Sequence, residues 1–305
     1  MPNYTLVSTG LTSGIGSYTN SYIEKNGKDF HHVMVCRDPS KVAKKANLTT
    51  VKCDLSSIAS TKNALEEIKS LVKNGKIPPI KTVLFNAGVS NFSRTVSSKD
   101  GFECTFHVNV ISPYLFAREL IPLLKEFGQG RFVVTGSHSH FADKEHTRNM
   151  VPKPYWDDSS MDPVIKPVAN PADANPETME AGLRSYATSK LALLYLFHEL
   201  ARRNPQVKFL VYEPGFVLGT GLGREASLLV RLLMKPAGLV FWLLGWSITK
   251  NKSGYLMAKA VFDDELFAKV NNMVYCDLGK IIKSSEDSYN VNREKQLLDT
   301  LERIV

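Results

Sequence analysis

The chain has 305 residues, of which 43% are hydrophobic, so it can form a sizeable core in one large domain or two small ones. Its 38 basic and 30 acidic residues give a formal charge of +8. The basic residues are scattered apart from the stretch 41–45, which argues against a dedicated nucleic-acid surface. No two of the four cysteines form a Cys-x-x-Cys pair, which predicts buried free thiols in a reducing compartment such as the cytoplasm.

The first predicted unit is a strand over 4–9, a glycine-rich turn and a helix over 17–25. The turn contains Gly10, Ser13, Gly14, Ile15 and Gly16. Glycines let a backbone approach a pyrophosphate, and free N–H groups at a helix start favour its negative charge. The spacing differs from the commonest Gly-x-Gly-x-x-Gly fingerprint, so a plain tight turn is the alternative.

The second predicted strand, 32–36, is followed by Arg37 and Asp38. Nicotinamide sites usually carry an acidic residue at this strand end to hold the ribose 2′-hydroxyl of NAD, whereas an arginine can hold a 2′-phosphate. Arg37 therefore favours NADP. Asp38 keeps NAD open, and a surface Arg–Asp pair is the structural alternative.

Small and polar residues follow the next strands, at 50–53, 82–85 and 131–137. They are Asp54 and Leu55, then Asn86, Ala87 and Gly88, and finally the strand-terminal Ser137. The carboxyl ends of parallel strands face the ligand crevice, so these residues are expected to border a nucleotide. Asn109 lies in a predicted helical stretch between the last two of these strands.

A proline-rich irregular segment is predicted over 138–184. A segment of this length inside a compact domain is typical of a lid or binding loop. His138, His140 and His146 lie in it, but no acidic or cysteine partner falls at ligand spacing, so we expect no metal site.

Tyr186 and Lys190 open the next predicted helix. Residues four apart share one helix face, and an ammonium beside a phenol lowers the tyrosine pKa from its usual value of about 10. Tyr186 can then serve as a general acid or base. Taken alone the pair is a weak signal, and a half-buried tyrosine beside a solvated lysine is the alternative.

After a strand over 207–212 come Pro214, Gly215, Val217 and Thr220, again at a strand end. The stretch 228–248 is strongly apolar but is interrupted by Arg231, Lys235 and Pro236, so it does not suit a membrane span. We expect two short amphipathic helices that wall a lipophilic pocket, within a substrate cap over 221–250. Peripheral membrane contact and ordinary core packing are the alternatives.

A helix over 252–263 and a last strand over 273–276 complete the pattern. Strands and helices alternate from end to end, which predicts a single α/β domain over 1–305: a doubly wound parallel sheet, or Rossmann fold, with helices on both faces. The inserted loop over 138–184 precedes the tyrosine helix, and the apolar helical cap lies toward the C-terminus.

These motifs, in this order, resemble the short-chain dehydrogenase/reductase superfamily over residues 4–220. The matching positions are Thr9 to Gly16, Asn86 to Gly88, Asn109, Ser137, Tyr186, Lys190, Pro214 and Gly215. The stretches 36–38, 248–254 and 274–276 resemble the retinol dehydrogenase and protochlorophyllide reductase branch. That resemblance implies NADP and a bulky, lipophilic carbonyl or conjugated substrate.

Two features depart from the family pattern. Ser13 stands where many NADP-using members have a basic residue, which leaves the 2′-phosphate to Arg37. The 49 positions from Ser137 to Tyr186 exceed the gap of the simplest members and resemble the inserted loops of monomeric carbonyl reductases. Both a monomer and a homodimer therefore remain open.

The resemblance also implies roles. Tyr186 would donate a proton to the substrate oxygen, Lys190 would lower the pKa of Tyr186 and bind the nicotinamide ribose, and Ser137 would stabilise the oxyanion. Asn109 would hold a water that connects Lys190 to solvent. The expected cofactor contacts are Gly10, Ser13, Gly14, Ile15, Gly16, Arg37, Asp54, Leu55, Asn86, Ala87, Gly88, Tyr186, Lys190, Pro214, Gly215, Val217 and Thr220.

The sequence thus predicts an NADPH-dependent oxidoreductase of a bulky lipophilic ketone or aldehyde. Reduction of a conjugated carbon–carbon double bond by the same residues is the first alternative. A non-catalytic NADP-binding scaffold is the second.

Overall fold

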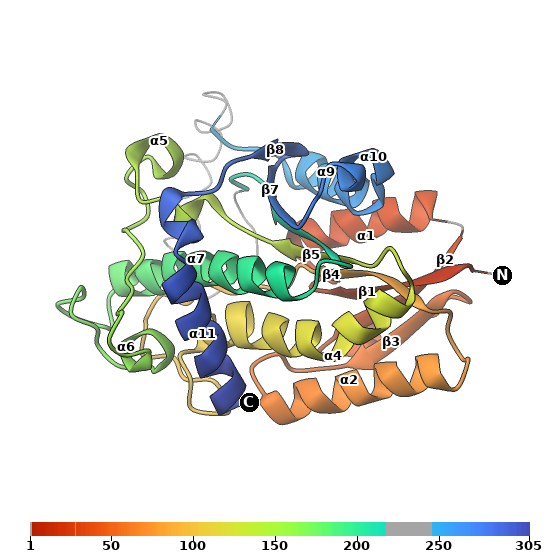
Figure 1. Cartoon of the computed structure of the whole chain (residues 1–305), viewed down its shortest axis with the longest axis horizontal. Helices are drawn as coiled ribbons and strands as arrows, with labels where there is room; N and C mark the ends of the chain where they lie inside the picture. The colour runs from red at the N-terminus through yellow and green to blue at the C-terminus, as the bar shows by residue number, and fades with distance from the viewer. Residues whose placement is uncertain (1, 28, 218–245) are drawn as a thin grey trace.

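The computed structural model describes residues 2–27, 29–217 and 246–305. The strands are β1 (Tyr4–Thr9), β2 (Phe30–Cys36), β3 (Leu48–Lys52), β4 (Ile80–Phe85), β5 (Arg131–Thr135), β6 (Lys208–Glu213), β7 (Met273–Asp277) and β8 (Lys280–Ile282). They form a sheet in the order β3-β2-β1-β4-β5-β6-β7-β8 (Figure 1). Neighbours pair in parallel from β3 to β7, and β8 pairs antiparallel with β7. The order reverses between β1 and β4, where ligands bind in open parallel sheets.

Helices cover both faces of this sheet (Figure 1). One face carries α1 (Gly14–Asn26), α9 (Lys250–Phe262) and α10 (Asp264–Ala268). The other carries α2 (Ile58–Lys73), α4 (Ser112–Glu126), α7 (Met179–Arg203) and α11 (Val291–Ile304). The shorter helices are η1 (Pro39–Lys41), α3 (Cys104–Phe106), η2 (His107–Ile111), η3 (His138–His140), α5 (Lys144–Thr147), α6 (Asp162–Ile165) and η5 (Glu286–Tyr289). The predicted doubly wound α/β fold is confirmed.

The central strands are buried because both of their faces are covered. In β1 every residue after Tyr4 is buried, and in β4 the last four residues are buried. Strands buried on both faces are expected in parallel sheets that lie between two helical layers. The polar side chains that bind ligands are therefore left to the residues that follow each strand.

The tyrosine helix begins earlier than the sequence analysis predicted. It starts at Met179, where the Thr178 hydroxyl accepts from the backbone N–H of Ala181, and it has 25 residues. Gly182 lies inside this helix. A Cβ at this position would lie 2.3 Å from the backbone oxygen of Asn91, so a side chain is excluded there. Close helix packing, rather than a turn, explains this glycine.

Two further differences concern a C-terminal strand and a cysteine. Strand β8 was not predicted, because it is only three residues long and pairs through a tight turn in which Leu278 has a φ of 47°. Of the four thiols expected to be buried, Cys104 is only half-buried. Positions 221–245 of the expected cap lie outside the described residues. Among the helices that the structure describes, none combines the length and apolarity needed to cross a bilayer.

The inserted segment is packed against the body of the chain. The Trp156 indole donates to Gln296 of α11 at 2.9 Å, and its ring lies 4.9 Å from that of Tyr195 on α7. Arg293 of α11 forms an ion pair with Asp158 at 2.7 Å. Helix α11 thus holds the inserted segment against α7.

Arg94 fixes the other side of the segment. It is 1% exposed, and its Nε donates to the backbone oxygen of Val168 at 2.7 Å. The guanidinium also donates to Ser185 of α7 at 2.8 Å and to the backbone oxygen of Pro163. One buried side chain therefore joins two points of the inserted segment to the tyrosine helix.

We expect Arg94→Met to lower the free energy of unfolding by about 2–4 kcal/mol, because buried acceptors lose their donor while the apolar stem is kept. Urea denaturation measures this loss. The control is Arg203→Met, whose side chain is 44% exposed in ion pairs with Glu199 and Glu302 and which should cost ~1 kcal/mol or less. Equal losses in the two variants would contradict the role of Arg94.

Candidate active site

The glycine-rich turn brings the start of α1 against the end of β4. Gly10 and Gly14 have φ values of 70° and 61°, which favour glycine. A Cβ at Gly10 would lie 2.5 Å from the backbone nitrogen of Ala87, and one at Gly16 would lie 2.0 Å from the Gly10 oxygen. Close backbone contact therefore requires glycine at positions 10 and 16, and the positive φ favours it at position 14. The N–H groups at the start of α1 suit an anion.

Asn86, which follows β4, links this turn to the end of β5. Its Nδ2 donates to the Gly10 oxygen at 2.9 Å, and its Oδ1 accepts from the Thr135 hydroxyl at 3.0 Å. The Ala87 N–H donates to the Thr9 hydroxyl at 3.1 Å. The ends of β1, β4 and β5 are thus held as one rigid edge.

The other predicted residues of the turn lie at the start of α1. Ser13 is the N-cap residue and is exposed, with extended backbone angles. Ile15 is half-buried and packs against the core beneath α1. Both are therefore next to the edge that the glycines form.

Asn109 lies in η2, which is a π-helix rather than the ordinary helix predicted. The Ser112 N–H bonds to the His107 oxygen, five residues back. The Asn109 amide is held on both sides: Oδ1 accepts from the Val89 N–H at 2.9 Å, and Nδ2 donates to Ser189 of α7 at 3.0 Å. Single π-turns of this kind are common at functional sites.

Lys190 reaches the same edge from α7. It is 4% exposed, and its Nζ donates to the Thr135 oxygen at 2.8 Å. Nζ also lies 5.6 Å from the ring centroid of Tyr186. A Cβ at Gly88 would be 3.7 Å from this Nζ and 3.3 Å from Asn109 Oδ1, so both atoms border the space beside Gly88.

Ser137 and Tyr186 meet beyond the end of β5. Ser137 is the N-cap of η3 and has extended backbone angles, and its hydroxyl forms a hydrogen bond with the Tyr186 phenol. Burial raises the pKa of Tyr186 to about 12, although this hydrogen bond opposes the rise. Burial lowers the pKa of Lys190 to about 8.

The expected lowering of the Tyr186 pKa by Lys190 is thus wrong for this arrangement. Desolvation of the phenolate outweighs the opposing influences, so Tyr186 is a phenol and Lys190 an ammonium at neutral pH. A phenol suits proton donation, which is the acid half of general acid–base chemistry.

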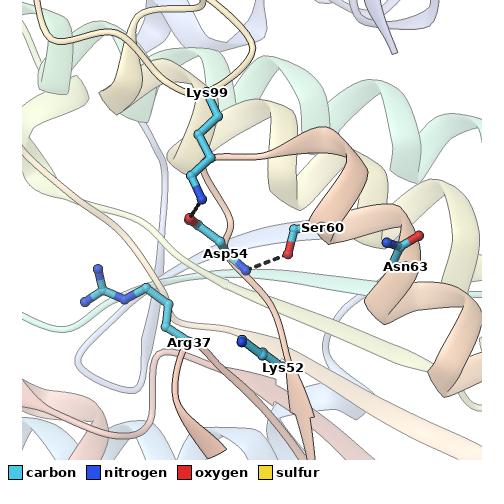
Figure 2. Close-up of a pocket in the computed structure, with 6 residues that line it drawn as sticks. All are labelled: Arg37, Lys52, Asp54, Ser60, Asn63 and Lys99. Atoms are coloured by element: carbon cyan, nitrogen blue, oxygen red, sulfur yellow. Dashed lines mark hydrogen bonds and ion pairs between the residues drawn. The ribbon is translucent and has the colours of Figure 1, made fainter.

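Arg37 borders a pocket of about 410 Å³ at the ends of β2 and β3. The pocket is lined by Arg37, Lys52, Asp54, Ser60, Asn63 and Lys99 (Figure 2). Lys99 forms an ion pair with Asp54 at 2.7 Å. Partial burial raises the pKa of Asp54, but hydrogen bonds from Lys99 and Ser56 outweigh it and lower the pKa to about 2.

Lys52 is a residue that the sequence analysis missed. It pairs in register with Cys36, so its side chain emerges next to Arg37 (Figure 2). Among the residues that the structure describes, the side chains of Arg37 and Lys52 form no ion pair or hydrogen bond. Two unneutralised cations beside one pocket attract an anion. Strand alternation over 48–52 is the signal that could have identified Lys52.

Leu55 turns away from this pocket toward the core. Its backbone oxygen accepts from the Ser112 hydroxyl at 2.6 Å, and its side chain packs against the apolar cluster under α2 and α4. Leu55 thus anchors the loop after β3, and Asp54 is the residue of this pair that lines the pocket.

Pro214, Gly215 and Val217 follow β6 at the same edge of the sheet. The Pro214 oxygen accepts from Ser253 of α9 at 2.6 Å. Gly215 has a φ of 78°, and a Cβ there would lie 2.8 Å from Ile248. Val217 is the last residue before 218–245, and the predicted Thr220 lies outside the described residues.

Known proteins resemble this chain along its whole length. A profile described as short chain dehydrogenase matches residues 4–148. Short-chain dehydrogenase iccH of Talaromyces variabilis is 25% identical and is aligned over 98% of this chain and 96% of its own length. Chloroplastic protochlorophyllide reductase B of Hordeum vulgare is 27% identical over 98% of this chain and 78% of its own length.

A solved structure shares the fold. A short chain dehydrogenase from Burkholderia cenocepacia in complex with NADP has a TM-score of 0.55 and is 14% identical, and the match covers 90% of this chain and 88% of that chain. At this identity the likeness concerns the fold.

We expect Gly16→Ala to lower the free energy of unfolding by about 1–3 kcal/mol, because the new methyl group meets backbone that cannot move independently. Urea denaturation is the measurement. Lys25→Ala, at the exposed end of the same helix, should change stability by about 0.5 kcal/mol or less. A Gly16→Ala protein as stable as wild type would show that the turn tolerates a side chain.

Proposed function

Because the chain belongs to the short-chain dehydrogenase/reductase superfamily, we propose that it reduces a bulky lipophilic ketone or aldehyde with NADPH. Membership of this superfamily makes it an oxidoreductase that uses NAD(P). The NADP preference, the substrate class and the roles of the residues are the proposal. The observation that carries it is the meeting of Ser137, Tyr186 and Lys190 beyond the end of β5.

The residues along the strand ends suit a dinucleotide. The glycine turn and the start of α1 would hold the pyrophosphate, and Arg37 and Lys52 would hold the 2′-phosphate. When bound, NADPH supplies a hydride to the carbonyl carbon of the substrate. The unneutralised charges of Arg37 and Lys52 support NADPH over NADH.

Tyr186 would donate its phenolic proton to the substrate oxygen. Its raised pKa keeps that proton in place at neutral pH. Ser137 would donate a hydrogen bond to the same oxygen and stabilise the negative charge that develops there.

Lys190 and Asn109 would support the tyrosine. The Lys190 ammonium donates one N–H to the Thr135 oxygen, and its other N–H groups suit the hydroxyls of the nicotinamide ribose. Asn109 Oδ1 and Lys190 Nζ border the same space beside Gly88, which supports a water-mediated route for reprotonation.

A lipophilic substrate is supported by the residues around 218–245. The large apolar side chains that flank this stretch, Phe216 and Trp246, are 41% and 39% exposed. The stretch between them is rich in leucine and valine. An apolar composition of this kind suits a bulky carbonyl compound better than a sugar.

Reduction of a conjugated carbon–carbon double bond by the same residues is the second candidate. Similarity to a protochlorophyllide reductase favours it. Products formed with 4-deuterated NADPH separate the two activities: deuterium on the carbinol carbon indicates carbonyl reduction, and deuterium on a former alkene carbon indicates the alternative.

Tyr186→Phe should lower kcat/KM for ketone reduction by about 10²–10⁴-fold, because the proton donor is lost. NADPH oxidation with a panel of aromatic and steroid-like ketones measures this. Tyr255→Phe, which alters an exposed tyrosine of α9, should retain wild-type activity. Reduction by Tyr186→Phe at the wild-type rate would overturn the proposed mechanism.

Arg37→Ala and Lys52→Ala should each raise the KM for NADPH by about 10–100-fold, since each removes a charge-assisted contact worth about 1.5–3 kcal/mol. The KM for NADH should change little, because NADH has no 2′-phosphate. Lys73→Ala, at the exposed end of α2, is the matched loss of charge and should leave both values unchanged. Equal loss for the two cofactors would reject the NADP preference.

A further inference from the structure

Glu213, the last residue of β6, carries a buried carboxylate at the same strand edge as the candidate site. It is 3% exposed. Its Oε2 accepts from the Tyr275 phenol at 3.0 Å, and its Oε1 accepts from the Gly215 N–H at 2.9 Å. Each oxygen receives a donor, an arrangement that suits the ionised carboxylate.

The backbone places the end of β6, which carries this carboxylate, beside the segment that leads from β5 to Ser137. Thr135, whose oxygen binds Lys190, pairs in register with Tyr212, the residue before Glu213. The next N–H, that of Gly136, donates to the Tyr212 oxygen at 2.7 Å. The segment that leads from β5 to Ser137 therefore runs directly alongside the end of β6.

Gly136 allows this close approach. A Cβ there would lie 3.2 Å from the Tyr275 ring, whose hydroxyl holds Glu213. The same tyrosine thus packs against the strand end that leads to Ser137 and fixes the carboxylate.

Several titratable groups surround Glu213 among the described residues. They are Tyr212 of β6, Tyr275 and Asp277 of β7, His138 of η3, and Tyr186 and Lys190 of α7. Burial lowers the pKa of His138, but a hydrogen bond with Asp277 and the charge of Glu213 outweigh it, so the pKa is raised. His138 Nε2 lies 3.4 Å from Asp277 Oδ2.

The charge of Glu213 acts on both members of the candidate catalytic pair in the same sense. Burial lowers the pKa of Lys190 and the nearby carboxylate opposes this, while burial and the carboxylate both raise the pKa of Tyr186. Burial raises the pKa of Glu213 itself, and His138, Tyr275 and the Gly215 N–H oppose that rise. The two donors that its oxygens receive, the Gly215 N–H and the Tyr275 phenol, support its ionised form.

We infer that Glu213 is a positioning residue for the reaction: held by Tyr275 and the Gly215 N–H, it keeps the Lys190 ammonium and the Tyr186 phenol protonated into the alkaline range. This inference rests on the proposed function of Tyr186 and Lys190. It adds a carboxylate, supplied by β6, to the groups that set the pH range of proton donation.

The test is the pH profile of kcat/KM for NADPH-dependent ketone reduction by Glu213→Gln, an isostere that can still accept from Gly215 and bond with Tyr275. Without the negative charge, the pKa values of Lys190 and Tyr186 fall. The alkaline limb should therefore move to lower pH by about 1 unit, with little change in substrate KM at pH 6. Glu213→Asp keeps the charge, so its alkaline limb should move by no more than about a third of that shift.

An alkaline limb of Glu213→Gln that coincides with that of wild type would overturn the inference. Glu213→Met, also uncharged and of similar length, serves in the same way if the glutamine variant does not fold, as judged by NADPH binding. An active Tyr186→Phe enzyme would instead defeat the proposed function itself, so the two failures are distinguishable.

Discussion

The buried ammonium of Lys190 donates to the last backbone oxygen of β5, and the candidate site depends on this contact. It ties the middle of α7 to the strand edge. Tyr186, one turn earlier on the helix, is thereby placed next to Ser137, two residues beyond the strand. Because the ammonium is removed from water, it requires such an acceptor, and a backbone carbonyl at a strand end supplies one without adding a charge.

A second constraint is the absence of side chains where backbones meet. The turn after β1, the end of β4 and the loop before Ser137 each come within contact distance of another segment at a glycine. Asn86, which follows β4, joins the turn after β1 and the end of β5 through hydrogen bonds to Gly10 and Thr135. Rigid strand ends of this kind hold polar groups in place without a reorganisation cost.

The inserted segment is integrated with this framework. Arg94 and Trp156 connect it to α7 and α11, so it covers the outer side of the tyrosine helix with hydrogen bonds as well as apolar contacts. This packing helps to order a proline-rich stretch, because the carbonyl groups of Pro163, Lys166 and Val168 accept hydrogen bonds from the buried Arg94 guanidinium.

Electrostatics divide the strand edge into two regions. Arg37 and Lys52 make the end at β2 and β3 positive, and Lys99 there is neutralised by Asp54. The carboxylates of Glu213 and Asp277 lie at the ends of β6 and β7, and that of Asp277 is 3.4 Å from His138. An anionic ligand is therefore favoured at one end, while the carboxylates at the other end favour the protonated forms of neighbouring groups.

The amino-acid sequence by itself determined the strand–helix alternation and the glycine turn, because these follow from local periodicity and spacing. It also determined the chain positions of Asn109, Ser137, Tyr186 and Lys190, because their order resembles that of a known superfamily. Lys52 and Glu213 were not identified from the sequence, because the surroundings of each form only when strands distant in sequence lie side by side. The direction of the Tyr186 pKa shift was also decided by tertiary structure. Helical spacing brings an ammonium near the phenol, but burial depends on everything packed around both groups, and here desolvation is the larger effect.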